Sequence, residues 1–298
     1  MKLSILTATY NRATFLPKLY NSIIENLESG LEIEWLIMDD GSQDDTRETV
    51  KQFIDEKKIE IKYNFQENQG KMAAINNMMQ YVTGDLIVDC DSDDYFTKDA
   101  FKMIKEEFET TPKQGLYAVC FLKEKEDGKI DGTTFKNEIS TMFDLYFKEK
   151  ATGEKGLVYY SDIRKKYKHE LEKNEKFITE ARMYHKMDEE YKMKCVNKTI
   201  TAGEYQENGY TSNILKTFTS SPYGYLKYFD EILQKDFRGV TWNKRLYVIK
   251  HYILFTVLTE QKLTTKKVKN ALNKIMIKVL YWPGKIKTKK SIKTTNNL

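Results

Sequence analysis

Short apolar runs alternate with segments whose apolar residues recur at helical spacing along the first hundred residues. The predicted strands cover residues 3–9, 34–38, 59–65 and 86–88. The predicted helices cover residues 15–27, 46–56, 71–82 and 99–108. Strands separated by helices of this length indicate βαβ units. We therefore predict an α/β fold with a mostly parallel central sheet flanked by helices.

The pattern is less regular in the rest of the chain. The predicted elements there are a strand at 116–122, a charged hairpin or loop at 124–132, mixed helices and short strands at 141–197, and helices at 223–282. The clearest boundary lies near residue 215, where a loop-like segment gives way to helices. We predict a first domain at 1–215, with halves at 1–110 and 111–215, and a helical C-terminal region at 216–298.

Carboxylate-rich polar residues follow several of the predicted strands. Ligands of open α/β sheets bind outside the carboxyl ends of the strands, so these clusters are expected to meet in one crevice. In residues 91–94, Asp91 and Asp93 form a D-x-D pair with Ser92 between them. Carboxylates are preferred ligands of Mg²⁺ and Mn²⁺ when substrate phosphates supply the remaining ligands. The alternative is an acidic turn that caps the helix beginning near Lys98.

Three further clusters accompany the D-x-D pair. Asp39 begins an Asp-Asp-Gly-Ser turn after the second strand, and it can accept hydrogen bonds from a base or a ribose, although Asp-Gly is also an ordinary turn pair. Thr7, Thr9, Tyr10 and Arg12 end the first strand and offer hydroxyls, an aromatic face and a cation. Asn68 and Lys71 flank a glycine at a predicted helix start, a position that suits an anionic group. The Walker and dinucleotide-binding glycine patterns are absent.

In this order and spacing, the four motifs resemble those of the family 2 glycosyltransferases, which have a nucleotide-binding GT-A fold. The resemblance is strong over residues 1–110 and fainter to about 215. It implies an inverting hexosyl or N-acetylhexosaminyl transferase. The implied donor is a nucleotide-diphosphate sugar, with UDP-sugars favoured by family habit. The implied acceptor is a hydroxyl of a glycan, a lipid-linked molecule or a cell-wall polymer. The halves 1–110 and 111–215 then become the donor and acceptor halves of the catalytic domain.

The resemblance also assigns roles to residues. Asp39 is expected to contact the nucleotide base. The D-x-D pair is expected to contact the ribose and to hold Mn²⁺ or Mg²⁺ on the diphosphate, with Asp93 as leading ligand, Asp91 beside it and Asp94 as a substitute. The other donor-binding candidates are Thr7, Thr9, Tyr10, Arg12, Asn68, Lys71 and Ser92. Residues 204–211 resemble a loop that lines the acceptor side in this family, or form an ordinary polar loop.

The expected catalytic base departs from the family pattern. The family usually carries a Glu-Asp pair at a helix start, and its Asp deprotonates the acceptor hydroxyl. Here the matching residues are Glu180 and Ala181. Glu180 is therefore the candidate base, because inversion requires a base within reach of the acceptor, and Glu175 is held in reserve. The alternative is that Glu180 is a surface glutamate at a helix start or an ion-pair partner of a nearby cation.

Charge adds a prediction about the C-terminal region. The net charge is +5, yet no acidic residue follows Glu260, while eleven lysines lie between Lys262 and Lys293. With interleaved aromatic residues, such a segment suits an anionic membrane surface. The alternatives are a solvated lysine-rich tail, packing on the catalytic domain or an oligomer interface. Nucleic acid is not the expected partner, because the acidic crevice would repel phosphate backbones.

The remaining features narrow the location and the class. The chain begins directly with a strand and shows no apolar leader, and its three cysteines lack a disulfide or zinc spacing. We expect a cytoplasmic protein, with peripheral attachment to the inner face of the membrane through its tail. His169, His185 and His251 have no triad or metal spacing and are expected at the surface or at an interface. The rival functions are a nucleotidyltransferase and a catalytically impaired nucleotide-sugar-binding protein.

Overall fold

The computed structural model describes residues 1–203 and 214–295, with side chains described for residues 1–203 and 217–288. It separates into two compact units, Met1–His169 with Met183–Glu207 and Glu170–Arg182 with Asn208–Leu298. The predicted loop at 204–211 lies outside the described residues. Among the described residues, no helix combines the length and apolar character needed to cross a bilayer.

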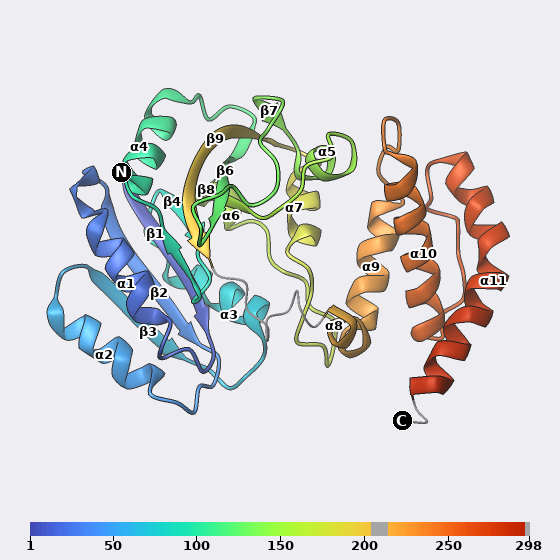
Figure 1. The fold of residues 1–298 in the computed structure, drawn as a ribbon, viewed down its shortest axis with the longest axis horizontal. Coiled ribbons are helices and arrows are strands. Elements are labelled where there is room, and N and C mark those ends of the chain that lie inside the picture. The colour runs from blue at the N-terminus through green and yellow to red at the C-terminus, as the bar shows by residue number, and fades with distance from the viewer. Residues whose placement is uncertain (204–213, 296–298) are drawn as a thin grey trace. The chain divides into compact units, whose positions relative to one another are not determined.

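The first unit is built on a nine-stranded sheet in the order β3-β2-β1-β4-β8-β6-β9-β5, with β7 paired to β9 (Figure 1). Its strands are β1 (Lys2–Thr9), β2 (Glu32–Asp39), β3 (Glu60–Phe65), β4 (Leu86–Asp89), β5 (Asp94–Phe96), β6 (Leu116–Lys125), β7 (Ile139–Ser140), β8 (Lys155–Tyr160) and β9 (Lys192–Gly203). The first four strands run parallel, whereas β8 is antiparallel to both β4 and β6. The sheet is thus parallel where the βαβ pattern predicted it and mixed beyond β4.

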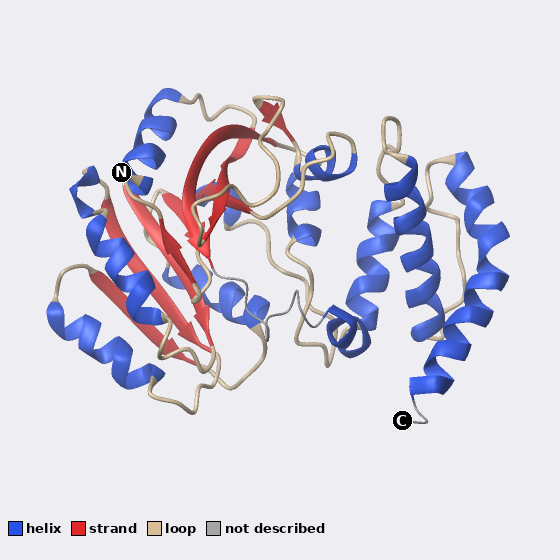
Figure 2. Cartoon of the chain, in the orientation of Figure 1, coloured by secondary structure: helices blue, strands red, loops and turns tan. Residues whose placement is uncertain are grey.

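Helices cover the sheet, as Figure 2 shows. Those that begin in the first unit are α1 (Leu16–Glu25), α2 (Thr46–Glu56), α3 (Lys71–Met78), α4 (Ala100–Thr110), α5 (Met142–Phe147) and α6 (Ser161–Arg164). Helix α7 (Ala181–Met187) begins at the end of the Glu170–Arg182 segment and continues into the first unit. Short 3-10 turns at Leu27–Ser29 and Met79–Tyr81 follow α1 and α3. Rings of Tyr20 on α1 and Phe53 on α2 stack 4.2 Å apart against the buried Trp35 of β2. These contacts fix both helices on the parallel part of the sheet.

The second unit is helical in its C-terminal part. It contains α8 (Ile214–Ser220), α9 (Pro222–Ile232), α10 (Trp242–Leu258) and α11 (Ala271–Thr295). Helix α10 packs against both α9 and α11, with Phe255 of α10 stacked 5.1 Å from Tyr225 of α9. The segment Glu170–Arg182 is grouped with this unit, and the predicted division into donor and acceptor halves stays a prediction. The predicted boundary near 215 stays a prediction.

Candidate functional site

The carboxyl ends of β2, β1 and β4 lie side by side at one edge of the sheet. Thr9 pairs with Asp39 across β1 and β2, and Leu6 pairs with Asp89 across β1 and β4. The amide of Asp40 donates to the carbonyl of Thr9 at 2.8 Å. Because parallel strands end at the same edge, the loops that follow them meet there. The structure therefore brings the polar clusters of the first, second and fourth strands together.

Asp39 is held rigidly at the end of β2. Its carboxylate is 1% exposed and accepts from the Ser42 amide at 2.7 Å and from the Tyr63 hydroxyl at 2.6 Å. Burial and the adjoining carboxylate raise the pKa of Tyr63, so its hydroxyl stays protonated and keeps donating. A carboxylate has about four acceptor positions, so Asp39 retains capacity to accept from a further donor.

The neighbouring Asp40 organises the loop before α3. Its carboxylate accepts from the Gln66 side chain and from the amides of Gln69 and Gly70, each at 2.8 Å. Gly41 has φ +91°, and a side chain there would meet the amide of Asn68 at 3.1 Å. The Asp40 carboxylate and the close approach at Gly41 thus hold the loop of Asn68 against the turn that carries Asp39. Sequence reasoning assigned no role to Asp40.

Two cations connect this edge to residues 91–94, here called the D-x-D loop. The ammonium group of Lys71, at the first position of α3, lies 2.6 Å from one carboxylate oxygen of Asp91. The guanidinium group of Arg12, after β1, lies 4.0 Å from the carboxylate of Asp93. These contacts join loops that follow β1, β3 and β4. Four of the predicted donor-binding residues are thereby placed around one loop.

The D-x-D loop carries more negative charge than these two cations balance. Burial, followed by the charge of Asp91, raises the pKa of Asp93 above its ordinary value. Burial also raises the pKa of Asp94 to about 7, although the nearby ammonium group of Lys123 opposes this shift. A divalent cation would relieve both effects, because it supplies positive charge where carboxylates are crowded and partly desolvated. The loop therefore fits Mn²⁺ or Mg²⁺.

Among the described residues, no group of three or more His, Cys, Asp or Glu side chains is arranged as a metal cluster. Asp93 and Asp91 are the carboxylates that would hold such an ion, with phosphate oxygens of a substrate as further ligands. Ser92, between them, is 6% exposed and therefore largely buried.

The sequence analysis did not identify Lys123. Its side chain supports the D-x-D loop by contacting Asp94. Its ammonium group on β6 lies 2.7 Å from the carboxylate of Asp94 and 2.7 Å from that of Glu154. Burial lowers the pKa of Lys123, but the two carboxylates outweigh it and leave the pKa above its ordinary value. A single lysine in a charged strand carries no sequence signal for this role. It acquires the role because β6 approaches β5 through β9.

The residues that end β1 fall into two groups. Thr7 is fully buried; its hydroxyl donates to the Cys90 carbonyl at 3.0 Å and accepts from the Trp35 indole at 2.9 Å. It therefore anchors the start of the D-x-D loop rather than facing the crevice. The hydroxyl of Thr9 is buried with no hydrogen-bond partner among the described residues, and Tyr10 is 47% exposed. Of these two residues, only Tyr10 therefore presents an accessible side chain, its aromatic ring.

The candidate base belongs to the second unit. Glu180 is half-buried and directly precedes α7. Arg182, two positions on, makes a bidentate contact with Glu231 of α9 at 2.9 and 2.7 Å and also donates to the carbonyl of Glu170. Glu175 accepts from the amides of Tyr223 and Gly224 at 2.7 Å each, at the start of α9. The contacts of Glu175 and Arg182, on either side of Glu180, thus hold this segment against α9.

The histidines are expected at the surface or at an interface, and two of them do not lie at the surface. His169 and His185 are 4% and 5% exposed. The backbone of His169 exchanges two hydrogen bonds with the side chain of Asn76, at 2.9 and 2.8 Å. His185 on α7 meets the edges of Phe143 and Phe147. Both therefore serve packing within the first unit, which local spacing does not reveal.

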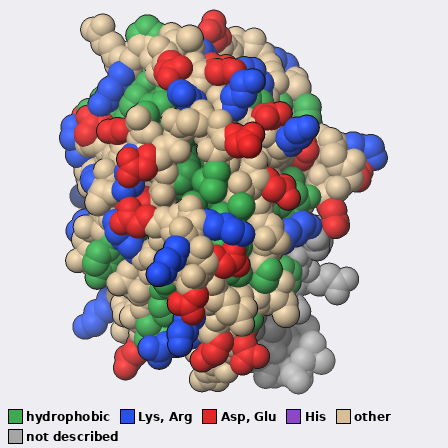
Figure 3. Space-filling model, turned by 90° about the vertical axis from the view of Figure 1, so that its left-hand side faces the viewer, with side chains coloured by type: hydrophobic (Ala, Val, Ile, Leu, Met, Phe, Trp, Pro, Cys, Tyr) green, Lys and Arg blue, Asp and Glu red, His purple; other side chains and the backbone are tan. Residues whose placement is uncertain are grey.

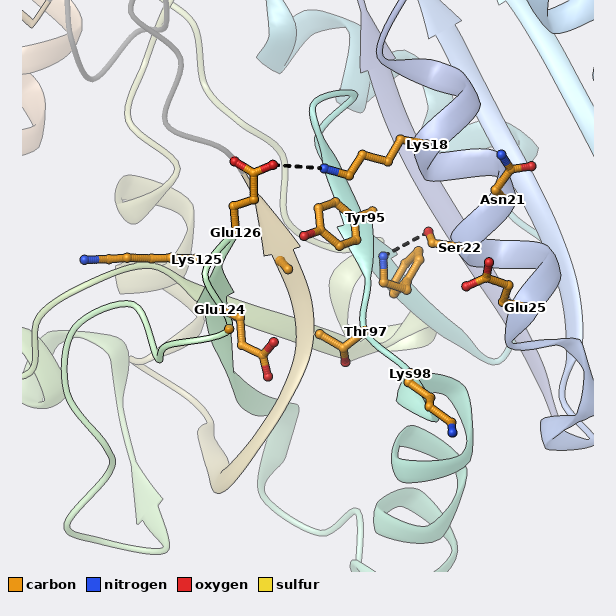
Figure 4. Close-up of a pocket in the computed structure, with 13 residues that line it drawn as sticks. Lys18, Asn21, Ser22, Glu25, Tyr95, Thr97, Lys98, Glu124, Lys125 and Glu126 are labelled. Carbon is orange, nitrogen blue, oxygen red and sulfur yellow. Dashed lines mark hydrogen bonds and ion pairs between the residues drawn. The ribbon is translucent and has the colours of Figure 1, made fainter.

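A cavity of about 420 Å³ lies between α1, β5 and the end of β6 (Figure 4). Lys18 lies 4.2 Å from the centre of the Tyr95 ring and 3.9 Å from the carboxylate of Glu126. The other residues that line the cavity include both acidic and basic side chains. None of the predicted donor-site residues lines this cavity, so it is separate from the edge described above.

Comparison with known proteins gives the class to which this fold and edge correspond. The model of glycosyl transferase family 2 matches residues 4–180, which is more than half of the chain. The chain belongs to this family. An uncharacterized glycosyltransferase of Nostoc sp. is 32% identical over 131 residues, covering 44% of this chain and 40% of that protein. A second, from Mycoplasma genitalium, is 36% identical over 109 residues, or 36% of this chain and 37% of that protein. The chain thus matches about two fifths of their length.

Solved structures confirm the predicted α/β GT-A fold. TarS residues 1–349 of S. aureus, in complex with UDP-GlcNAc, align with a TM-score of 0.58 at 18% identity, over 87% of this chain and 72% of that one. A mannosyltransferase of Pyrobaculum calidifontis, in complex with GDP-Man and Mn²⁺, aligns with a TM-score of 0.56 at 15% identity, over 97% of this chain and 83% of that one. At these identities the likeness shows the fold alone.

Proposed function

We propose that the protein is an inverting glycosyltransferase that takes a hexosyl or N-acetylhexosaminyl group from a nucleotide-diphosphate sugar with the help of a divalent ion. The observation that carries this proposal is the convergence of Arg12 and Lys71 on Asp93 and Asp91. The two cations can neutralise phosphate oxygens, and the two carboxylates can ligate a metal ion, which supports the proposal. The family membership and the nucleotide sugars bound by the two structural neighbours support the same conclusion.

The geometry of the strand ends supports a proposal for the donor site. Asp39, with acceptor capacity to spare, receives hydrogen bonds from the base, and the exposed ring of Tyr10 offers a stacking face. Lys71 and Arg12 neutralise phosphate oxygens. A Mn²⁺ or Mg²⁺ ion bound at Asp93 and Asp91 would stabilise the charge that develops on the departing diphosphate. Asn68 borders the same edge and supplies a further polar group.

Inversion requires one displacement, with a base on the face opposite the leaving group. We assign this role to Glu180, which accepts the proton of the acceptor hydroxyl as its oxygen attacks the anomeric carbon. Glu175 is less suited, because both of its carboxylate oxygens already accept from the start of α9. Ala181, where the family usually has an acid, favours the rival proposal of a nucleotide-sugar-binding protein with impaired catalysis.

UDP-sugars stay our first proposal, and TarS in complex with UDP-GlcNAc supports it. A dolichyl-phosphate beta-glucosyltransferase of Trichomonas vaginalis, 28% identical over 144 residues, supports a lipid-linked acceptor beside a glycan or cell-wall polymer. It covers 46% of this chain and 45% of its own length. We further propose a cytoplasmic protein that meets an anionic membrane through its basic C-terminal region.

A product assay tests the proposal. The protein is incubated with a panel of nucleotide sugars, with Mn²⁺ and with a chelator, and released nucleoside diphosphate is measured. Metal-dependent release, increased by an acceptor, supports the transferase. Release of pyrophosphate from a nucleoside triphosphate and a sugar phosphate would instead identify a nucleotidyltransferase. Metal-dependent binding of a nucleotide sugar without any release, at every acceptor tried, would identify the impaired binding protein.

A further inference from the structure

Helix α11 is apolar on two opposite sides. One side packs against α10 (Figure 1), where Asn273 and Ile277 are fully buried. A side chain at Gly284 would meet Ile253 of α10 at 2.9 Å, so the two helices approach closely at this point. Arg245 of α10 is buried against the same helix and donates to Asn273. This side is fully accounted for by packing within the second unit.

The other side of α11 carries a row of large exposed apolar residues. Their spacing is three and four residues in alternation, which puts them on one face of a helix. The row, here called the α11 stripe, consists of Leu272, Ile275, Val279, Trp282 and Ile286, exposed by 44%, 60%, 66%, 65% and 56%. Apolar surface gathered in this way, in contrast to single exposed residues, marks an interaction site.

The charges around the stripe identify what it contacts. No acidic residue follows Glu260 in the sequence, so every charged side chain of α11 is a lysine. Lys278 is exposed beside the stripe, and Lys285 lies 5.2 Å from the ring centre of Trp282. On the face of the molecule that Figure 3 shows, acidic and basic side chains are intermixed. The single sign of charge on α11 therefore contrasts with that face.

These features decide between three partners. A second copy of the same helix would bring two lysine-only surfaces together, and like charges at an interface oppose association. A nucleic acid would use the lysines but would leave the five apolar side chains in water. An anionic lipid surface fits both the apolar residues and the lysines. Its acyl chains can bury the α11 stripe, and its anionic headgroups can pair with the lysines. Tryptophan is also enriched where hydrocarbon meets headgroups.

We propose that α11 lies in the interface of a membrane rich in anionic lipids, with the α11 stripe facing the acyl chains and its lysines at the headgroups. The helix thus serves as an in-plane attachment surface. This inference specifies the face behind the membrane contact proposed above. It does not depend on the transferase reaction, because no donor-site residue enters it.

Vesicle binding by the full chain tests the proposal. The probes are vesicles of phosphatidylglycerol mixed with phosphatidylcholine, and vesicles of phosphatidylcholine alone. We expect binding to the mixed vesicles and a shift of Trp282 emission to shorter wavelength, and the shift should be absent in Trp282→Phe. Ile275→Ser with Val279→Ser should weaken the partition coefficient by at least about tenfold. Ile54→Ser, an exposed isoleucine of α2 in the first unit, is the matched control and should bind like the wild type.

A second pair of variants tests the charge. Lys278→Gln with Lys285→Gln should weaken binding to the mixed vesicles by about fivefold for each lysine removed. This loss of affinity should be smaller at high salt, because salt screens the attraction between lysines and headgroups. Lys51→Gln with Lys102→Gln, on exposed positions of α2 and α4, should have no such effect. Circular dichroism of each variant confirms that the helices are retained.

Three results would overturn the proposal. The first is equal binding by wild type and the Ile275→Ser/Val279→Ser variant. The second is a stable dimer in sedimentation that this variant abolishes, which would assign the stripe to a second copy. The third is binding to a single-stranded RNA, but not to vesicles, that depends on Lys278 and Lys285. Metal-dependent nucleotide release is measured in parallel, so a failure of the proposed enzymatic function is recognised separately.

Discussion

Replacing Glu34 with glutamine should destabilise the first unit by removing a buried charge that joins its four parallel strands. The Glu34 side chain on β2 is fully buried. It accepts from Lys62 on β3 at 2.8 Å, from the Thr83 hydroxyl and amide at 2.6 and 2.7 Å, from the Gly84 amide at 3.1 Å, and from the Ser4 hydroxyl on β1. These contacts lie in the same sheet as the proposed donor site, which is at the carboxyl ends of the strands.

The magnitude follows from the pKa. Burial alone would raise the pKa of Glu34, but the hydrogen bonds from Lys62, Ser4 and Thr83 outweigh it and lower the pKa from 4.5 to about 2. A folded-state pKa below the unfolded value stabilises the fold above the unfolded pKa, and this contribution disappears as the pH falls toward the folded value. The difference corresponds to about 3 kcal/mol at neutral pH.

Urea denaturation followed by tryptophan emission is the assay. Trp35 is buried in the same strand, whereas Trp242 and Trp282 are 57% and 65% exposed in the second unit, so the change on unfolding reports mainly on the first unit. The gap in unfolding free energy between wild type and Glu34→Gln should be about 3 kcal/mol at neutral pH. It should narrow steadily between pH 4.5 and about 2.

Glu32→Gln is the matched control, because the Glu32 side chain lies two positions away on β2 and is 70% exposed. It should change the free energy of unfolding by less than about 1 kcal/mol. Equal losses in the two variants would refute the reasoning. A gap for Glu34→Gln that does not change with acidification would also refute it, since the stabilisation would then not come from the charge.

Two further predictions concern the proposed base and the contacts that hold it. Glu180→Gln should leave metal-dependent donor binding unchanged and lower kcat for transfer by about 10²–10⁴-fold; turnover at the wild-type rate would remove Glu180 from the role. Glu231→Gln weakens the bidentate contact with Arg182, so it should lower the free energy of unfolding of the second unit by about 1–3 kcal/mol and reduce kcat at constant donor affinity. A change in donor KM alone, measured by initial rates, would contradict that assignment.

The strands and helices of the donor half could be predicted because their signals are local. The predicted helix at 46–56 coincides with α2, where the apolar Val50 and Phe53 recur at helical spacing. The predicted strand at 3–9 differs from β1 by a single residue at its start. The D-x-D pair after β4 could be found for the same reason, since a strand end followed by acids is visible within ten residues.

Features that depend on distant pairing could not be predicted in this way. Strand β5 was missed because it has three residues, is read locally as an acidic turn, and exists through pairing with β9 about a hundred positions away. Lys123 reaches the D-x-D loop only through this arrangement. The segment with Glu180 joins α9 through the contact between Arg182 and Glu231, 49 positions apart. No local pattern reports such contacts.

The most direct test of the central claim is a calorimetric titration of UDP, and of GDP as a second nucleotide, into the protein with and without Mn²⁺. If the loop carrying Asp93 and Asp91 holds a nucleotide diphosphate through a divalent ion, one nucleotide should bind only with Mn²⁺. Asp93→Ala should abolish that heat while the variant stays folded. Binding that is equally strong with and without the ion, or that survives Asp93→Ala unchanged, would contradict the account.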